Sequence, residues 1–70
     1  MLTEIDITLN GDPRRIGAGA TVGGLIATLG LDRRKVAVER NREIVPRSRY
    51  EEVALADRDQ IEIVHFIGGG

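Results

Sequence analysis

The chain has 70 residues, no cysteine, and 10 basic against 11 acidic side chains, for a formal net charge of −1. This length holds one small domain, and the lack of cysteine excludes disulfides, thiolate metal sites and a catalytic thiol. The balanced charge argues against nonspecific nucleic-acid binding, and no stretch approaches the ~20 apolar residues of a membrane span.

The beginning of the chain is acidic, with Glu4 and Asp6 where a signal peptide carries basic residues before an apolar run. Small secreted domains also depend on disulfides more often than cytoplasmic ones do. We therefore expect a cytoplasmic protein that binds neither membranes nor nucleic acid.

A β-hairpin is predicted first. Apolar residues alternate with polar ones over residues 5–9, which is typical of a half-buried strand. Asn10-Gly11 accepts the positive φ angles of a type I′ turn. Residues 12–16 are the predicted return strand, and Pro13 suits a strand at a sheet edge.

A helix is predicted next, after a loop at residues 17–20. Thr21 is the expected N-cap, and Gly30 is placed to end the helix in a left-handed conformation. Gly23 and Gly24 each cost up to about 1 kcal/mol relative to alanine, so the helix needs a sheet to pack on. Its apolar positions follow the i, i+3, i+4, i+7 spacing: Val22, Leu25, Ile26 and Leu29.

Three more strands are predicted, at residues 36–40, 43–45 and 60–66. Asn41-Arg42 joins the first two, although Arg42 suits the positive φ of a tight turn poorly. Residues 47–55 are expected to be irregular with one short helical turn, and residues 57–59 to form a turn.

The order ββαβββ requires the helix to cross one face of the sheet. The first and last strands are the most apolar, so we place them side by side and parallel at the sheet centre. This predicts an α+β fold of the β-grasp (ubiquitin-like) type, with a mixed sheet packed on one main helix. Residues 1–66 form the predicted domain and residues 67–70 a flexible C-terminal glycine tail.

The chain ends in Gly68-Gly69-Gly70. Three glycines have no side chains to pack and lose much backbone entropy on folding, so they do not serve stability. They form a thin tail that presents the Gly70 carboxylate, which is ionised at neutral pH. A carboxylate must be activated before acyl transfer, and no phosphate-binding loop is present to hold ATP. An activating partner enzyme is therefore implied; the competing interpretation is a frayed end or a linker remnant.

The chain resembles the thiamine-biosynthesis sulfur carriers of the ThiS family over nearly its whole length. The closing segment, residues 61–70 (IEIVHFIGGG), is the most specific part of this resemblance. Shorter matches are residues 9–11 (LNG), 20–22 (ATV) with Leu25, 36–39 (VAVE) with Asn41, and 44–48 (IVPRS).

The resemblance implies a sulfur carrier that is not an enzyme and has no catalytic residues of its own. A ThiF-like enzyme would adenylate Gly70 with ATP, and sulfur would replace AMP to give a thiocarboxylate. A ThiG-like thiazole synthase would then take the sulfur for the thiazole ring of thiamine. No metal or bound cofactor is implied, since ATP is used by the activating partner, and we expect a monomer when the protein is free.

Val64 and Phe66 alternate with Ile61 and Ile63, so they are expected on the solvent face of the last strand. We interpret them as a partner-binding patch beside the tail; a covered second face or a self-association surface would explain them too. His65 is the only histidine, and no nucleophile or carboxylate at a useful spacing makes it catalytic.

The middle of the chain is basic. The run starts at Arg33-Arg34-Lys35 and continues to Arg49. A solvated face balanced by acids explains this pattern, as does steering toward an acidic partner. RNA binding is disfavoured because the chain has one tyrosine and one phenylalanine for base stacking. The acids expected to balance the run are Glu39, Glu43, Glu51 and Glu52.

Two other functions remain open on the sequence. A carrier with the same chemistry could supply molybdenum-cofactor synthesis or tRNA thiolation. Alternatively, a ubiquitin-like interaction module could carry an inert tail. No constellation of residues supports a small enzyme.

Overall fold

The computed structural model describes residues 3–66, and its first unit is the predicted hairpin. Strands β1 (Glu4–Leu9) and β2 (Asp12–Gly17) are antiparallel, with Leu9 opposite Asp12. Asn10 and Gly11 have φ angles of 51° and 86°. Positive φ at both central residues is the type I′ turn, whose twist matches that of the strands, so this prediction is confirmed.

Helix α1 (Val22–Thr28) follows the capping signals in the sequence. The Thr21 hydroxyl accepts a hydrogen bond from the Gly24 N–H at 3.1 Å, which satisfies a free donor of the first turn. Gly30, with φ of 72°, reverses the chain, and its N–H donates to the Ala27 carbonyl at 3.0 Å. The predicted helix is therefore confirmed, and it ends one residue early because Leu29 is its C-cap.

The second hairpin joins β3 (Val36–Arg40) to β4 (Glu43–Val45). A 3₁₀ turn lies on either side of it, η1 (Arg33–Lys35) before and η2 (Arg47–Arg49) after. The η2 turn confirms the short helical turn expected within residues 47–55.

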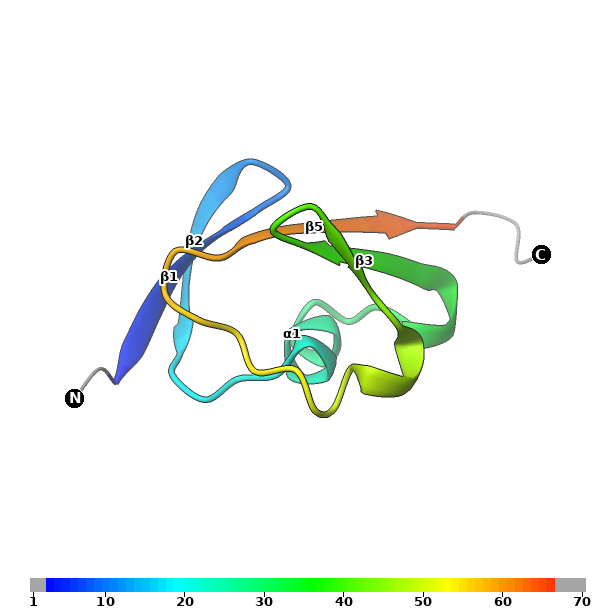
Figure 1. Ribbon diagram of the computed structural model, residues 1–70, viewed down its shortest axis with the longest axis horizontal. Helices are drawn as coiled ribbons and strands as arrows, with labels where there is room; N and C mark the ends of the chain where they lie inside the picture. Colours follow the sequence, from blue (N-terminus) through cyan, green and yellow to red (C-terminus); the bar gives the residue numbers. More distant parts are fainter. Residues whose placement is uncertain (1–2, 67–70) are drawn as a thin grey trace.

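Strand β5 (Gln60–His65) lies in the middle of the sheet, whose order is β2-β1-β5-β3-β4 (Figure 1). It runs parallel to β1 and antiparallel to β3. The predicted central pairing of the first and last strands is confirmed. Phe66, expected inside the strand, follows its end, although its N–H still donates to the Lys35 carbonyl at 2.7 Å.

The core lies between one face of the sheet and helix α1, as Figure 1 shows. The helix buries Val22, Leu25 and Ile26 against the sheet. The irregular segment after β4 closes the core, since it buries Tyr50 and Leu55. The α+β, β-grasp arrangement is therefore present: a mixed sheet with one helix on one face. Within residues 3–66, no helix covers the other face of the sheet, which we call the open face.

Candidate functional site

Two apolar side chains at the end of β5 are exposed to solvent. Ile61 and Ile63 are 1% and 8% exposed, whereas Val64 and Phe66 are 58% and 46% exposed. Alternation along the strand accounts for this, because Ile61 and Ile63 face the helix. The predicted exposure of Val64 and Phe66 is confirmed, and their role in partner binding stays a prediction.

A third exposed apolar side chain, Ile44 on β4, was not identified from the sequence. Ile44 is 76% exposed. It pairs with Glu39 of β3, and Ala37 of β3 pairs with Val64, so these side chains share the open face of the sheet. We call Ala37, Ile44, Val64 and Phe66 the sheet patch. Ile44 precedes Val45, which is buried, and that alternation is the signal that predicts its exposure.

The tail residues Gly68, Gly69 and Gly70 lie outside the described residues, and so does the boundary proposed after residue 66. What the structure describes is the strand that leads to them. Phe66 is four residues from Gly70, a span of at most roughly 13 Å in an extended chain. Val64 and Phe66 of the sheet patch therefore belong to the segment that leads to these residues, whereas Ala37 and Ile44 lie on β3 and β4.

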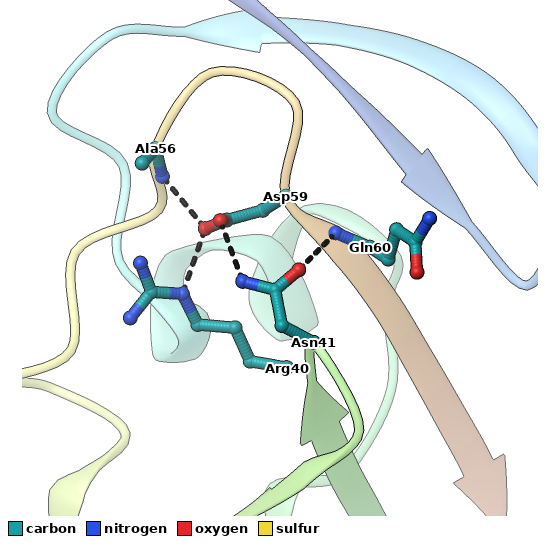
Figure 2. Close-up of polar contacts among 5 residues, drawn as sticks. All are labelled: Arg40, Asn41, Ala56, Asp59 and Gln60. Carbon is teal, nitrogen blue, oxygen red and sulfur yellow. Dashed lines mark hydrogen bonds and ion pairs between the residues drawn. The ribbon is translucent and has the colours of Figure 1, made fainter.

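The beginning of β5 is fixed by the buried side chain of Asp59 (Figure 2). Its Oδ2 accepts hydrogen bonds from Arg40 Nε at 2.7 Å and from the Ala56 N–H at 2.8 Å. Its Oδ1 accepts from Asn41 Nδ2 at 3.0 Å. Asn41 Oδ1 in turn accepts from the Gln60 N–H at 2.9 Å. One carboxylate thus joins the β3–β4 turn to the first residues of β5.

These contacts set the charge state of Asp59. Burial raises the pKa of its carboxyl, but hydrogen bonds from Arg40, the Ala56 N–H and Asn41 favour the ionised form. Together they hold the pKa of Asp59 below its usual value. The sequence predicted only a turn at residues 57–59. The available signal for the Asp59 contacts was the position of an acid directly before an apolar strand.

Asn10 fixes β5 from the other side. Its Oδ1 accepts from the Ile63 N–H at 2.8 Å, and its Nδ2 donates to the Ile63 carbonyl at 3.2 Å. The side-chain amide therefore replaces a strand neighbour at the point where β1 has turned away. With β3 bonded along its other edge, β5 is held on both sides up to Ile63, and by β3 alone at Val64 and His65.

His65 is exposed at the end of β5. Within residues 3–66, no three His, Asp or Glu side chains gather as a metal site would require. In the same part of the chain, no helix is both long enough and apolar enough to cross a bilayer.

Most of the basic residues in the middle of the chain have acidic neighbours. The ion pairs are Arg33–Glu51, Arg34–Asp32, Arg40–Asp59 and Arg49–Glu52. The Arg34 hydrogen bonds lower the pKa of Asp32 to about 2. Glu51 and Glu52 thus balance the basic run as expected, whereas Glu39 and Glu43 form no ion pair within residues 3–66.

Known proteins share both the sequence and the arrangement of the sheet. The ThiS family model matches residues 7–70. The chain belongs to the ThiS family. It is 56% identical over 50 residues to the sulfur carrier protein ThiS of Bacillus subtilis, covering 71% of this chain and 76% of that protein. The family assignment confirms the resemblance read from the closing segment and agrees with a carrier that is not an enzyme.

A crystal structure of the thiamine biosynthesis protein ThiS from Geobacter metallireducens superposes with a TM-score of 0.80 at 29% identity, covering 94% of this chain and 100% of that one. The β-grasp assignment is thereby confirmed. A thiazole synthase of Paramagnetospirillum magneticum is 56% identical over 64 residues, 91% of this chain. The chain spans only 20% of the length of that synthase. In such relatives, a segment like this ThiS chain is part of a much longer polypeptide.

Proposed function

We propose that this ThiS-family protein carries sulfur on its C-terminal glycine for synthesis of the thiamine thiazole. An oxygen of the Gly70 carboxylate attacks the α-phosphorus of ATP on a ThiF-like enzyme, giving the acyl-adenylate and pyrophosphate. Hydrosulfide supplied by a sulfur donor then attacks the acyl carbon, the bond to AMP breaks, and loss of a proton gives the thiocarboxylate. Gly68 and Gly69 provide the clearance that a narrow nucleotide site requires.

The observation that carries this proposal is that the strand which precedes the three glycines in the sequence lies at the centre of the sheet. Asp59 fixes the beginning of β5, and Asn10 holds the strand at Ile63, so the domain supplies a fixed platform for the residues that follow. ATP is used by the activating enzyme in this proposal, and the carrier binds no cofactor.

A ThiG-like thiazole synthase is the proposed acceptor. Two thiazole synthases contain a segment 55–56% identical to this chain within one polypeptide. Joining two proteins covalently raises the effective concentration of each for the other. The presence of both segments in one polypeptide therefore supports the thiazole synthase as a partner of this carrier. A cytoplasmic location and a monomeric free state stay predictions.

Intact-mass spectrometry tests the proposal directly. The chain is incubated with a ThiF-like enzyme, ATP and a sulfur source, and its mass is expected to rise by the difference between one sulfur and one oxygen atom. The charged chain is then given to a thiazole synthase, which is expected to consume the thiocarboxylate.

Two variants serve as controls for the site of charging. A chain that lacks Gly70, and one extended by a serine beyond it, are expected to fold normally and to gain no sulfur. An unchanged mass of the native chain, under conditions that charge the Bacillus subtilis carrier, would favour an inert interaction module. Delivery of sulfur to a different synthase in preference to thiazole synthase would favour another pathway.

A further inference from the structure

Two glutamates lie opposite each other on the open face of the sheet, among the residues of the sheet patch. Glu39 of β3 is directly opposite Glu62 of β5 in the register. Glu39 also pairs with Ile44 on its other side, and the adjacent row of the sheet is Ala37 opposite Val64. Two acids are therefore bordered by the exposed apolar side chains of the open face.

This pair is unfavourable for the isolated domain. Like charges directly opposite on neighbouring strands destabilise a sheet. Neither carboxylate forms an ion pair or a side-chain hydrogen bond within residues 3–66. Of the nine other acids in that range, five have cations and four do not: Asp6, Asp32, Glu51, Glu52 and Asp59 are paired, whereas Glu4, Asp12, Glu43 and Asp57 are not. The fold therefore leaves a double negative charge without a counter-charge at the centre of its open face.

We propose that Glu39 and Glu62 together bind an arginine or lysine side chain of the thiazole synthase, which packs on the sheet patch. This inference rests on the proposed function, since it names how the proposed acceptor binds. A guanidinium has several N–H donors in a planar fork and can bridge two neighbouring carboxylates. The apolar side chains around the pair exclude water when covered, which strengthens the attraction.

The location of the pair favours the synthase as the occupant. Glu62 lies on β5, the strand that carries the chain end, so a protein that takes up the end meets this face of the sheet. Two relatives combine such a segment with a thiazole synthase in one polypeptide. A cation bound between the acids would also fix the orientation of the domain, because complementary charges determine register more than they add affinity.

The test measures binding of the full-length, uncharged chain to its own organism's thiazole synthase by isothermal titration calorimetry at low and high salt. The Glu39→Gln, Glu62→Gln double variant is expected to bind about tenfold more weakly at low salt and to lose most of the salt dependence. Glu43→Gln is the matched control. Glu43 is an exposed acid next to Ile44, and strand alternation places the Glu43 side chain on the other face of the sheet. Replacing Glu43 is expected to leave the dissociation constant unchanged.

Thermal unfolding separates a binding role from a structural one. The double variant is expected to unfold at the same temperature as the native chain or at a higher one, because a repulsive pair has been removed. A lower unfolding temperature overturns the proposal, as does synthase binding by the double variant with native affinity and native salt dependence. Neither of these results would contradict the charging of Gly70 with sulfur. Conversely, if Gly70 were not charged but the synthase bound normally, the proposed function would be rejected and the binding role of the two glutamates would stand.

Discussion

Arg42 adopts a left-handed backbone conformation that a side chain makes costly. Its φ is 70°, and Asn41 before it has φ of 52°. These are the angles of a type I′ turn, the same turn that Asn10-Gly11 forms in the first hairpin. Asparagine tolerates positive φ, while an arginine there strains the turn. The sequence predicted this conflict at Arg42, and the structure shows that the turn forms in spite of it.

Replacing Arg42 with glycine is therefore expected to stabilise the protein. The gain should be about 0.5–1 kcal/mol in the free energy of unfolding, because glycine adopts positive φ without a steric cost. Urea denaturation measures it. Arg14→Gly is the control: it removes the same charge from an exposed position in β2, where glycine weakens a strand. Equal destabilisation by both variants would contradict the account of the turn.

Gly23 shows why some residues cannot be interpreted from the sequence. The sequence indicates only a poor helix former at this position. In the structure, a Cβ on Gly23 would lie 2.8 Å from Arg33 Nη2 and 2.9 Å from Glu51 Oε1. The ion pair between these two residues lies over the helix start. Nothing local to Gly23 predicts that proximity, since the pair joins segments that meet only in the folded protein.

Among the elements, β5 depends most on polar contacts that begin outside it. Asp59 joins Arg40, Asn41 and Ala56 just before the strand starts. Hydrophobic periodicity predicts the strand well, because it reflects the faces of a sheet. It contains no information about which distant turn an acid will contact. Sequence reasoning placed Asn10 and Asp59 in turns but did not predict their contacts with and around β5.

Asp59 should make stability depend on pH. Its carboxyl has a pKa lower in the folded protein than in the unfolded chain, so the folded state favours the ionised form. Its contribution is fully present above the unfolded pKa of about 3.9 and is lost as the pH falls through the folded value. We expect Asp59→Asn to lower the free energy of unfolding at pH 7 by about 2–3 kcal/mol and to flatten its decline below pH ~4.

Urea denaturation between neutral and acidic pH measures both effects. Asp6→Asn is the matched control, because Asp6 also pairs with an arginine, Arg15, but both side chains are about two-thirds exposed. An exposed pair contributes less than about 1 kcal/mol. If the two variants behaved alike, the Asp59 contacts would not be what fixes the beginning of β5.

At the scale of the whole molecule, one face of the sheet supports the fold and the other is left open. The first and last strands were predicted side by side and parallel at the centre because both are strongly apolar, and the helix was predicted to cross one face of the sheet. The extent of the sheet patch was not predicted, since Ile44 joins it only through the pairing of β4 with β3. Sequence reasoning thus found the strand that carries the end, but only half of the surface beside it.

Substitution on the open face should impair partner reactions without unfolding the domain. Val64→Thr, Phe66→Thr is expected to change the free energy of unfolding by less than about 1 kcal/mol and to lower kcat/KM for charging by the ThiF-like enzyme about tenfold. Charging is followed by intact mass over time. His65→Thr changes the residue between them, which points to the other face, and should charge at the native rate. A normal rate for the double variant would show that charging does not use this surface.

The central position of β5 has a mechanical consequence. Any force that a partner applies to the end of the chain acts lengthwise on a strand that has hydrogen-bonded neighbours on both sides, β1 and β3. Lengthwise tension loads those bonds together, in shear, instead of opening them one after another. The domain is therefore expected to keep its shape under such a load.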